Sequence, residues 1–219
     1  MVVVHPDSPR ANTLATVLEE RGRESGWAGV SRIGYTAGEQ GARLAGEARQ
    51  AGANTVFFLG SGRDLKAFLS GATRSAFSPA VFVVGGAAGR EILELPRDFG
   101  GHVYVALPSL PLPQASNAGR ALHELVAKSG LPRRHEAFQV WAYSAGRILI
   151  EALRSAGRRL DREKLITALE GLYDFDAGAP APVRFGPERR IGTAGAAVIE
   201  IDARSQRLIA ISDWVSPDL

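Results

Sequence analysis

One serine of the chain stands one residue away from the nucleophile-elbow pattern Gly-x-Ser-x-Gly of serine hydrolases. Ser144 lies in the run Ala142-Tyr143-Ser144-Ala145-Gly146, in which alanine replaces the first glycine. In hydrolases with this motif the histidine base follows the serine in the chain. The four histidines here are His5, His102, His123 and His135. All of them precede the serine, so we expect Ser144 to lie inside an amphipathic helix and the protein not to be an enzyme.

The spacings of a metal or cofactor site are missing from the sequence. It contains no cysteine, which excludes disulfides and thiolate metal ligands. The histidines lack the His-x-x-x-His and His-Glu-x-x-His spacings of zinc sites. The glycine-rich runs at 60–62 and 85–89 depart from the dinucleotide pattern, and the lysine of a phosphate-binding loop is absent. We therefore expect neither a metal nor a cofactor.

Charge and hydropathy argue against two further classes of partner. The formal net charge is +3, and the arginine pairs at 133–134, 158–159 and 189–190 are scattered along the chain. A nucleic-acid-binding protein usually gathers such charge on one face, so we expect no nucleic-acid partner. No apolar run approaches the roughly 20 residues of a membrane-spanning helix, and the start MVVVHPDS does not resemble a signal peptide. We expect a cytosolic protein, or one whose targeting segment lies outside this chain.

The first half of the chain alternates short apolar runs with helical stretches. The expected strands are Val2–His5, Val30–Tyr35, Thr55–Leu59, Ala80–Val84 and His102–Ala106. The expected helices between them lie near Ala11–Glu24, Gln40–Ala51 and Leu65–Arg74. This alternation is typical of right-handed βαβ units. We therefore predict an α/β fold in three layers, with a parallel sheet and helices on both of its faces.

Polar residues and glycines follow these strands at their carboxyl ends. In parallel α/β sheets the ligand binds beyond those ends. Glycines there let a ligand approach the backbone closely and leave helix N-termini open to anions. The candidate ligand-binding residues of the loops are Asp7, Ser8, Ser61, Gly62, Arg63, Gly85, Gly86 and Ala87. A further loop, Pro108–Pro111, follows the last of the five strands.

The second half changes character after the proline-rich stretch Leu107–Pro113, which suggests a crossing between substructures. Helices are expected near Ala118–Lys128, Glu136–Ala156 and Arg162–Leu172, the last capped by Asp161. The middle helix has one apolar face, made of Ala145, Ile148, Leu149, Ala152 and Leu153. Val183–Phe185 is expected to be a short strand, and Ala196–Ile201 and Leu208–Trp214 an antiparallel hairpin.

Several local motifs occur in a fixed order along the chain. They are Tyr35-Thr36-Ala37-Gly38-Glu39, Ala51–Val56, Ala142-Tyr143-Ser144-Ala145, Arg158–Leu165 with Ala168-Leu169, and Pro182-Val183-Arg184-Phe185. The third is similar to an "aYdA" helix start and the last to a "GpvxF" strand. In this order the motifs resemble the type I periplasmic solute-binding proteins of ABC transporters, in the branched-chain amino acid and amide group. The resemblance runs through nearly the whole chain.

The resemblance implies two α/β lobes around a ligand cleft, joined by three hinge crossings. It begins part of the way into the family pattern, so we expect a fragment of a longer periplasmic protein. Residues 1–110 would be most of the C-terminal lobe, 111–193 a mostly helical segment returning to the N-terminal lobe, and 194–219 a hairpin returning to the C-terminal lobe. The helices of the incomplete lobe would need another chain, or each other, to cover their apolar faces. We therefore expect self-association.

The resemblance also implies site residues. Phe138 matches an aromatic ligand contact of the branched-chain amino acid binders, and Ser61 or Gly62 matches their ligand-contacting tyrosine. Gly86 or Ala87 stands where those binders have the acid that holds the ligand's ammonium group. An ammonium group brought there would lose its water without gaining a counter-charge.

Two positively charged residues and one altered loop bear on the ligand class. Arg63 and Arg90 flank the glycine loops and would favour a carboxylate or another anion. Asp7-Ser8-Pro9-Arg10 replaces an aromatic-glycine pair that contacts ligand in the family. The leading hypothesis is a solute-binding protein for an amino acid, an amide or a small carboxylate, serving an ABC permease. The alternative is a degenerate binding fold used for protein docking or ligand sensing.

Overall fold

The computed structural model of this 219-residue chain describes residues 1–36, 38, 41–85, 90–107, 116–131, 136–178, 181–205 and 207–216. The chain forms two compact units. Unit 1 consists of Met1–Leu107 and Val198–Asp213, and unit 2 of Pro108–Ala197 and Trp214–Leu219. The chain therefore passes from one unit to the other three times, after residues 107, 197 and 213.

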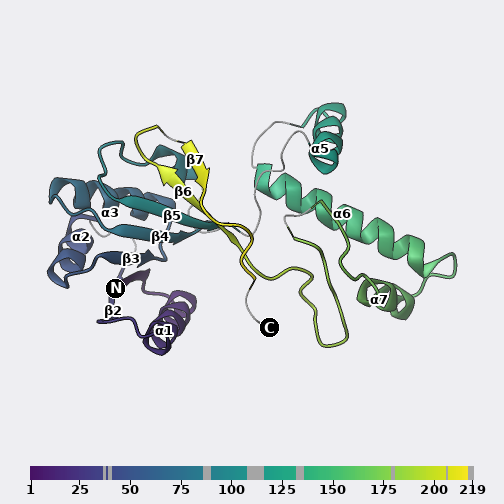
Figure 1. Ribbon diagram of the computed structural model, residues 1–219, viewed down its shortest axis with the longest axis horizontal. Helices are drawn as coiled ribbons and strands as arrows, with labels where there is room; N and C mark the ends of the chain where they lie inside the picture. Colours follow the sequence, from purple (N-terminus) through teal and green to yellow (C-terminus); the bar gives the residue numbers. More distant parts are fainter. Residues whose placement is uncertain are drawn as a thin grey trace. The chain divides into compact units, whose positions relative to one another are not determined.

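A seven-stranded sheet with the strand order β2-β1-β3-β4-β5-β6-β7 organises unit 1. The strands are β1 (Val2–Pro6), β2 (Ser31–Tyr35), β3 (Thr55–Phe58), β4 (Ala80–Val84), β5 (His102–Leu107), β6 (Ala197–Asp202) and β7 (Arg207–Ala210). The first five pair in parallel, while β6 and β7 form an antiparallel hairpin beside β5 (Figure 1). The predicted parallel sheet and hairpin are confirmed.

Helices cover both faces of this sheet. The helical elements in the described part of unit 1 are α1 (Pro9–Glu24), α2 (Gly41–Gln50), α3 (Gly62–Arg74) and the 3₁₀ helix η1 (Arg90–Glu94). Successive strand residues point to opposite faces. Phe58 contacts Phe68 of α3, with 5.4 Å between ring centroids, whereas Phe57 stacks at 5.9 Å on Trp27, which follows α1. Helices α1 and α3 therefore lie on opposite faces, and the predicted α/β class is confirmed.

The α3 face of the sheet holds the core of unit 1. Its side chains are fully or almost fully buried, and they include Val56, Phe58, Val81, Val83, Val103 and Val105. Helices α2 and α3 pack together at two facing glycines. A methyl group added at Gly41 would overlap the backbone of Ala67, and one added at Gly71 would lie 2.7 Å from the Cα of Ala42. The absence of side chains there lets the two backbones approach closely.

The opposite face carries a row of aromatic rings across three strands. Phe57 of β3 lies 5.1 Å from Phe82 of β4, which lies 4.9 Å from Tyr104 of β5. Trp27 extends the row at one end and His102 at the other, each 5.9 Å from its neighbour. Phe57, Phe82 and Tyr104 are half-buried. This face is therefore less completely covered than the α3 face.

The described residues of unit 2 form three helices and an irregular segment. They are α5 (Asn117–Lys128), α6 (Glu136–Ala156) and α7 (Arg162–Glu170), close to the predicted ranges. Ser116 caps α5 through the N–H of Gly119, and the predicted cap Asp161 accepts the N–H of Lys164 at 2.8 Å. No helix in the described ranges is long and apolar enough to cross a membrane.

The predicted strand Val183–Phe185 is wrong. Only Val183 makes a β-bridge, by exchanging hydrogen bonds of 2.9 and 3.1 Å with Phe175. The next two residues bond elsewhere, because the N–H of Arg184 donates to Gly192 and that of Phe185 to Leu172. Consecutive residues thus pair with two different segments, around residues 172–175 and at Gly192, and no ladder forms.

The second hairpin strand is shorter than predicted. Strand β7 ends at Ala210 rather than at Trp214. A side chain takes over from the ladder here, because the Ser212 hydroxyl accepts the N–H of Val198 at 2.8 Å. The N–H groups of Ile211 and Ser212 both donate to the carbonyl oxygen of Val198, and regular pairing is found beyond them as a bridge between Ala196 and Val215.

Candidate functional site

The strand order of unit 1 reverses between β1 and β3. From β1 the chain passes through α1 to β2 on one side, and from β2 through α2 to β3 on the other side of β1. In open parallel sheets such a switch point leaves a crevice at the carboxyl ends of the strands, where ligands bind. Two predicted loops border it, because Asp7 and Ser8 follow β1, and Ser61, Gly62 and Arg63 follow β3.

One further predicted residue lies at the same edge, and three cannot be placed there. Gly85 follows β4 directly, where an added methyl group would overlap the side chain of Leu107. Gly86 and Ala87 lie outside the described residues. Phe138 belongs to α6 in unit 2, and its side chain is not among those that the structure describes. The structure therefore brings six of the nine candidate residues to one edge of one unit.

The loop after β1 is tied to β2 and to α1. The N–H of Asp7 donates to the carbonyl oxygen of Tyr35 at 2.7 Å. The Ser8 hydroxyl accepts the N–H of Ala11 at 3.3 Å and so caps α1. The exposed carboxylate of Asp7 accepts a long hydrogen bond from Asn12, at 3.4 Å. Ser8 thus has a structural role, whereas Asp7 presents charge at the edge.

The loop after β3 is built around a second capping serine. The Ser61 hydroxyl accepts the N–H of Asp64 at 3.3 Å and donates to the Oδ2 of the same residue at 2.7 Å. Gly62 begins α3 and is buried, whereas Arg63 is exposed. Of the three predicted residues in this loop, Arg63 presents charge to solvent, while the Ser61 hydroxyl is already paired.

The structure adds two residues that sequence reasoning missed, Tyr35 and Asp64. The hydroxyl of Tyr35, at the end of β2, donates to Asp64 Oδ2 at 3.1 Å. Tyr35 reaches α3 across the end of β3, where Gly60 leaves room for it, because a methyl group at Gly60 would overlap the phenol oxygen. The Ser61-x-x-Asp64 spacing is a capping signal that the sequence does show. Nothing in the sequence marks Tyr35 as its partner.

Asp64 provides a second negative charge at this edge, besides that of Asp7. Its Oδ2 accepts hydrogen bonds from Ser61 and Tyr35, while Oδ1 has no hydrogen-bond partner in the described part of the chain. The N-terminus of α3 stabilises the carboxylate. The site thus offers a held carboxylate with one open oxygen.

Removing the Tyr35 hydroxyl should flatten the alkaline dependence of stability. Burial, followed by repulsion from Asp64 and the hydrogen bond to it, raises the pKa of Tyr35 above its ordinary value of 10.0. Below pH 10 both folded and unfolded chains keep this proton. At higher pH the unfolded chain loses it first, so the stabilisation is lost as the pH rises. The free energy of unfolding should fall by about 1.4 kcal/mol from this group between pH 8 and 11.

Urea unfolding at pH 8 and pH 11 measures this dependence. The difference between the wild type and Tyr35→Phe isolates one phenol from the other titrating groups. At neutral pH the variant should be about 1–2 kcal/mol less stable, since Asp64 loses a hydrogen bond. An equally steep alkaline decline in the variant would show that Tyr35 ionises as readily when folded.

Ser144 lies within α6 and not at a strand-to-helix turn. It is 6% exposed, and its hydroxyl has no hydrogen-bond partner among the described residues. Val140 and Ala152, which lie one turn before and two turns after it, are also buried. The serine therefore lies inside a helix, as predicted, and no described histidine reaches it. The predicted apolar face is only partly right, because Ala145, Leu149 and Leu153 are exposed while Ser144 belongs to the buried stripe.

The described residues offer no constellation for metal chemistry. No group of three or more histidine, aspartate or glutamate side chains among them could hold a metal ion. The polar groups gathered at the strand ends are suited to hydrogen bonding and charge pairing with a small solute.

Comparisons with known proteins agree with this arrangement. The sequence matches the model of a family described as "Periplasmic binding protein" over residues 1–206. No curated protein matched. Among solved structures, a branched-chain amino acid ABC transporter from Thermus thermophilus with bound valine is similar, with a TM-score of 0.77 and 18% sequence identity. A leucine binding protein from Thermotoga maritima has a TM-score of 0.70 and 15% sequence identity. A fatty acid ABC transporter substrate-binding protein from Thermomonospora curvata has a TM-score of 0.75 and 14% sequence identity.

These three alignments cover 99% of this chain. In the other direction the chain spans 60% of the first two structures and 57% of the third. At these identities the likeness concerns the fold.

Proposed function

Since the chain belongs to the periplasmic binding protein family, we propose that it is the extracytoplasmic, periplasmic solute-binding component of an ABC-type uptake system. The family is one of binding proteins, so the protein is not an enzyme. This chain forms all or part of the solute-binding protein. The proposed partner is an ABC permease, which receives the solute from that protein. Units 1 and 2 would correspond to the predicted lobe segments 1–110, 111–193 and 194–219.

The observation that carries this proposal is the edge of unit 1 at the β1–β3 switch point. It gathers the exposed charges of Asp7 and Arg63 with the held carboxylate of Asp64. Both helices that start there have their first turns fixed by serine caps. The Asp64 carboxylate, held by Ser61 and Tyr35 before a ligand arrives, loses little conformational entropy on binding.

The charges at this edge favour an amino acid, an amide or a small carboxylate. The open Oδ1 of Asp64 is placed to accept an N–H from an ammonium or amide group, and the Arg63 guanidinium is suited to a carboxylate. Asp64 thus supplies the counter-charge that the positions of Gly86 and Ala87 lack. Valine, leucine and fatty acids, named for the similar structures, all carry a carboxylate.

Thermal unfolding with matched ligands tests the proposal. The panel is leucine, valine, their amides, and 4-methylpentanoate, which is leucine without its ammonium group. A ligand at about 100 times its dissociation constant adds about 2.7 kcal/mol, which raises the midpoint by several degrees. Asp64→Asn should reduce the response to leucine and its amide more than the response to 4-methylpentanoate.

Asp161→Asn is the matched control, because Asp161 is also a hydrogen-bonded carboxylate at the start of a helix but belongs to unit 2. It should lower the midpoint without changing the ligand shifts. A cooperatively melting protein that responds to no ligand would contradict the proposal. That outcome would favour the alternative, a degenerate binding fold used for protein docking or ligand sensing. In that case the half-buried aromatic row of unit 1 would be the surface for docking.

We also propose that the chain self-associates through α6. Opposite its buried stripe this helix exposes Leu149 by 48%, Ile150 by 50% and Leu153 by 37%. An exposed apolar face of a helix is normally covered by another element or another chain. The open position of Gly146, at the middle of the helix, would let a second copy of α6 approach closely.

Light scattering coupled to size-exclusion chromatography should show twice the 23.3 kDa of one chain. Leu149→Arg should give the mass of one chain, because it places a charge in the proposed contact. Val17→Arg is the control, since Val17 is exposed by 45% on α1 in unit 1, and it should leave the mass unchanged. A monomeric wild type at high micromolar concentration would refute self-association.

A further inference from the structure

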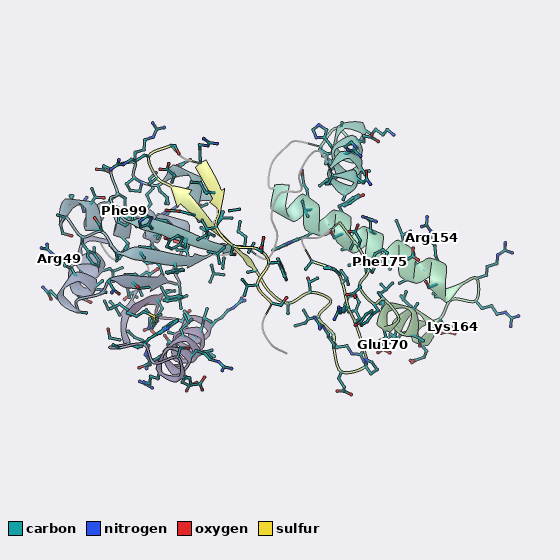
Figure 2. All side chains as sticks on the ribbon, in the orientation of Figure 1. Arg49, Phe99, Arg154, Lys164, Glu170 and Phe175 are labelled. Atoms are coloured by element: carbon teal, nitrogen blue, oxygen red, sulfur yellow. The ribbon has the colours of Figure 1, made fainter. Side chains whose placement is uncertain are left out.

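Arg147 of α6 is a half-buried cation with no acidic partner in the described part of unit 2. Its Cζ lies 5.9 Å from the ring centroid of Tyr143, one turn earlier on α6, and 5.9 Å from that of Phe175. Phe175 lies alongside α6 in Figure 2. No hydrogen bond or ion pair joins Arg147 to another described residue. Aromatic faces attract a guanidinium weakly and leave its five N–H groups unsatisfied.

Arg184 of the same unit shows what a satisfied arginine looks like here. Its guanidinium lies 4.5 Å over the ring of Tyr173 and pairs with the carboxylate of Asp174. It therefore combines an aromatic neighbour with an acid. Arg147 has the aromatic neighbours alone, although it is the more buried of the two.

Besides the two aromatic rings, the backbone at Gly178 lies close to the Arg147 guanidinium. Gly178 has a φ of +75°, and a methyl group there would lie 3.2 Å from Nη1 of Arg147 and 3.3 Å from Cε1 of Tyr143. Asp176 is the acid nearest in sequence to this glycine. Its Oδ1 accepts the N–H of Gly178 at 2.8 Å, and it forms no ion pair with Arg147. The carboxylate is engaged in a turn rather than in neutralising the cation.

A second unpaired polar group lies one turn before Arg147. The hydroxyl of Ser144 is almost completely buried and has no hydrogen-bond partner. Two adjacent turns of α6 thus carry the Ser144 hydroxyl, which is shielded from water, and the Arg147 guanidinium, which is partly shielded from water. Each such group costs free energy unless a partner reaches it.

We propose that Arg147 is the centre of an anion site within unit 2, which takes the carboxylate of a small organic acid. A planar guanidinium binds a carboxylate through two parallel N–H···O bonds, and partial burial strengthens the pair. Tyr143 and Phe175 provide apolar walls for the body of the acid. The site uses other elements than the strand-end edge of unit 1, so it goes beyond the solute binding proposed above.

Benzoate is the probe, tested on the full 219-residue chain. Sodium benzoate should raise the midpoint of thermal unfolding with a saturating dependence, beyond the effect of sodium chloride at the same ionic strength. Arg147→Gln should abolish this shift, and Arg147→Lys, which keeps the charge but loses the fork, should weaken it at least several-fold. Arg184→Gln is the matched control and should respond as the wild type does.

Two further measurements keep the proposal open to refutation. The Nε–Hε resonance of Arg147 in the wild type should move on benzoate titration, which tests the site even where a variant folds poorly. Asp64→Asn and Arg63→Gln should retain the benzoate shift, so failure of the unit 1 site leaves this result unaffected. The proposal is overturned if Arg147→Gln keeps the shift, if chloride produces it equally, or if it disappears in the unit 1 variants instead.

Discussion

Replacing Gly41 with alanine should lower the free energy of unfolding by about 3 kcal/mol or more. The added methyl group would overlap the backbone of Ala67, and backbone atoms, unlike the end of a flexible side chain, cannot move aside alone. Helix α2 would have to separate from α3, which carries Leu65, Phe68 and Leu69 of the core. Gly71→Ala should act in the same direction, since its methyl group would lie 2.7 Å from Ala42 Cα.

Gly46→Ala is the matched control for this result. Gly46 lies in the same helix, but a methyl group there would meet no atom within 4 Å. Alanine is a better helix former than glycine, so this variant should gain about 0.5–1 kcal/mol. Urea unfolding followed by circular dichroism compares the variants. Equal stability of Gly41→Ala and Gly46→Ala would show that the backbones of α2 and α3 are farther apart than in the structure.

Replacing Phe58 with alanine should cost about 3–5 kcal/mol. The ring is 1% exposed and lies between Tyr35, at 6.2 Å, and Phe68, at 5.4 Å between centroids. Its loss would leave a cavity under the loop that begins α3. Because Tyr35 packs against this ring, the hydrogen bond between Tyr35 and Asp64 should loosen as well. The proposed ligand shift at the unit 1 edge should therefore decrease together with stability.

The neighbouring phenylalanine provides the comparison. Phe57→Ala removes the same atoms from the adjacent residue, but on the half-buried aromatic face between Trp27 and Phe82. Its cost should be less than half of that at Phe58, because partly exposed atoms lose less on truncation. Denaturant titrations of both variants provide the test. Equal losses would mean that the aromatic face is as well covered as the α3 face.

The strands and caps of unit 1 follow from local sequence. Strands of a parallel sheet with helices on both faces are nearly continuous apolar runs, so β1, β3 and β4 could be located to within a residue. The turn after each strand, with its serine and glycines, identified the edge that gathers Asp7, Ser61 and Arg63. The helix Glu136–Ala156 was located at its actual bounds because its apolar pattern persists over many turns.

The parts that local sequence could not provide depend on contacts between distant segments. Tyr35 and Asp64 are 29 residues apart, and they meet only because the sheet register and Gly60 bring a phenol over β3. Val183 has strand-like neighbours in sequence, yet their hydrogen bonds go to two different segments, around residues 172–175 and at Gly192. Likewise, the pairing of Ser212 with Val198 shortens β7 in a way that propensity does not encode.

The place of the β6–β7 hairpin at the edge of the sheet has a consequence for the order of events during synthesis. β5 ends at residue 107, but its neighbour β6 begins only at residue 197, and the contact at 2.6 Å between His102 and Glu200 spans 98 residues. At about 5–20 residues per second, a ribosome needs roughly 5–20 s to make the intervening chain. Throughout that time β5 is an open strand edge, able to pair with a neighbouring nascent chain. Whatever binds or shields that edge in those seconds determines how much of the protein reaches the folded state.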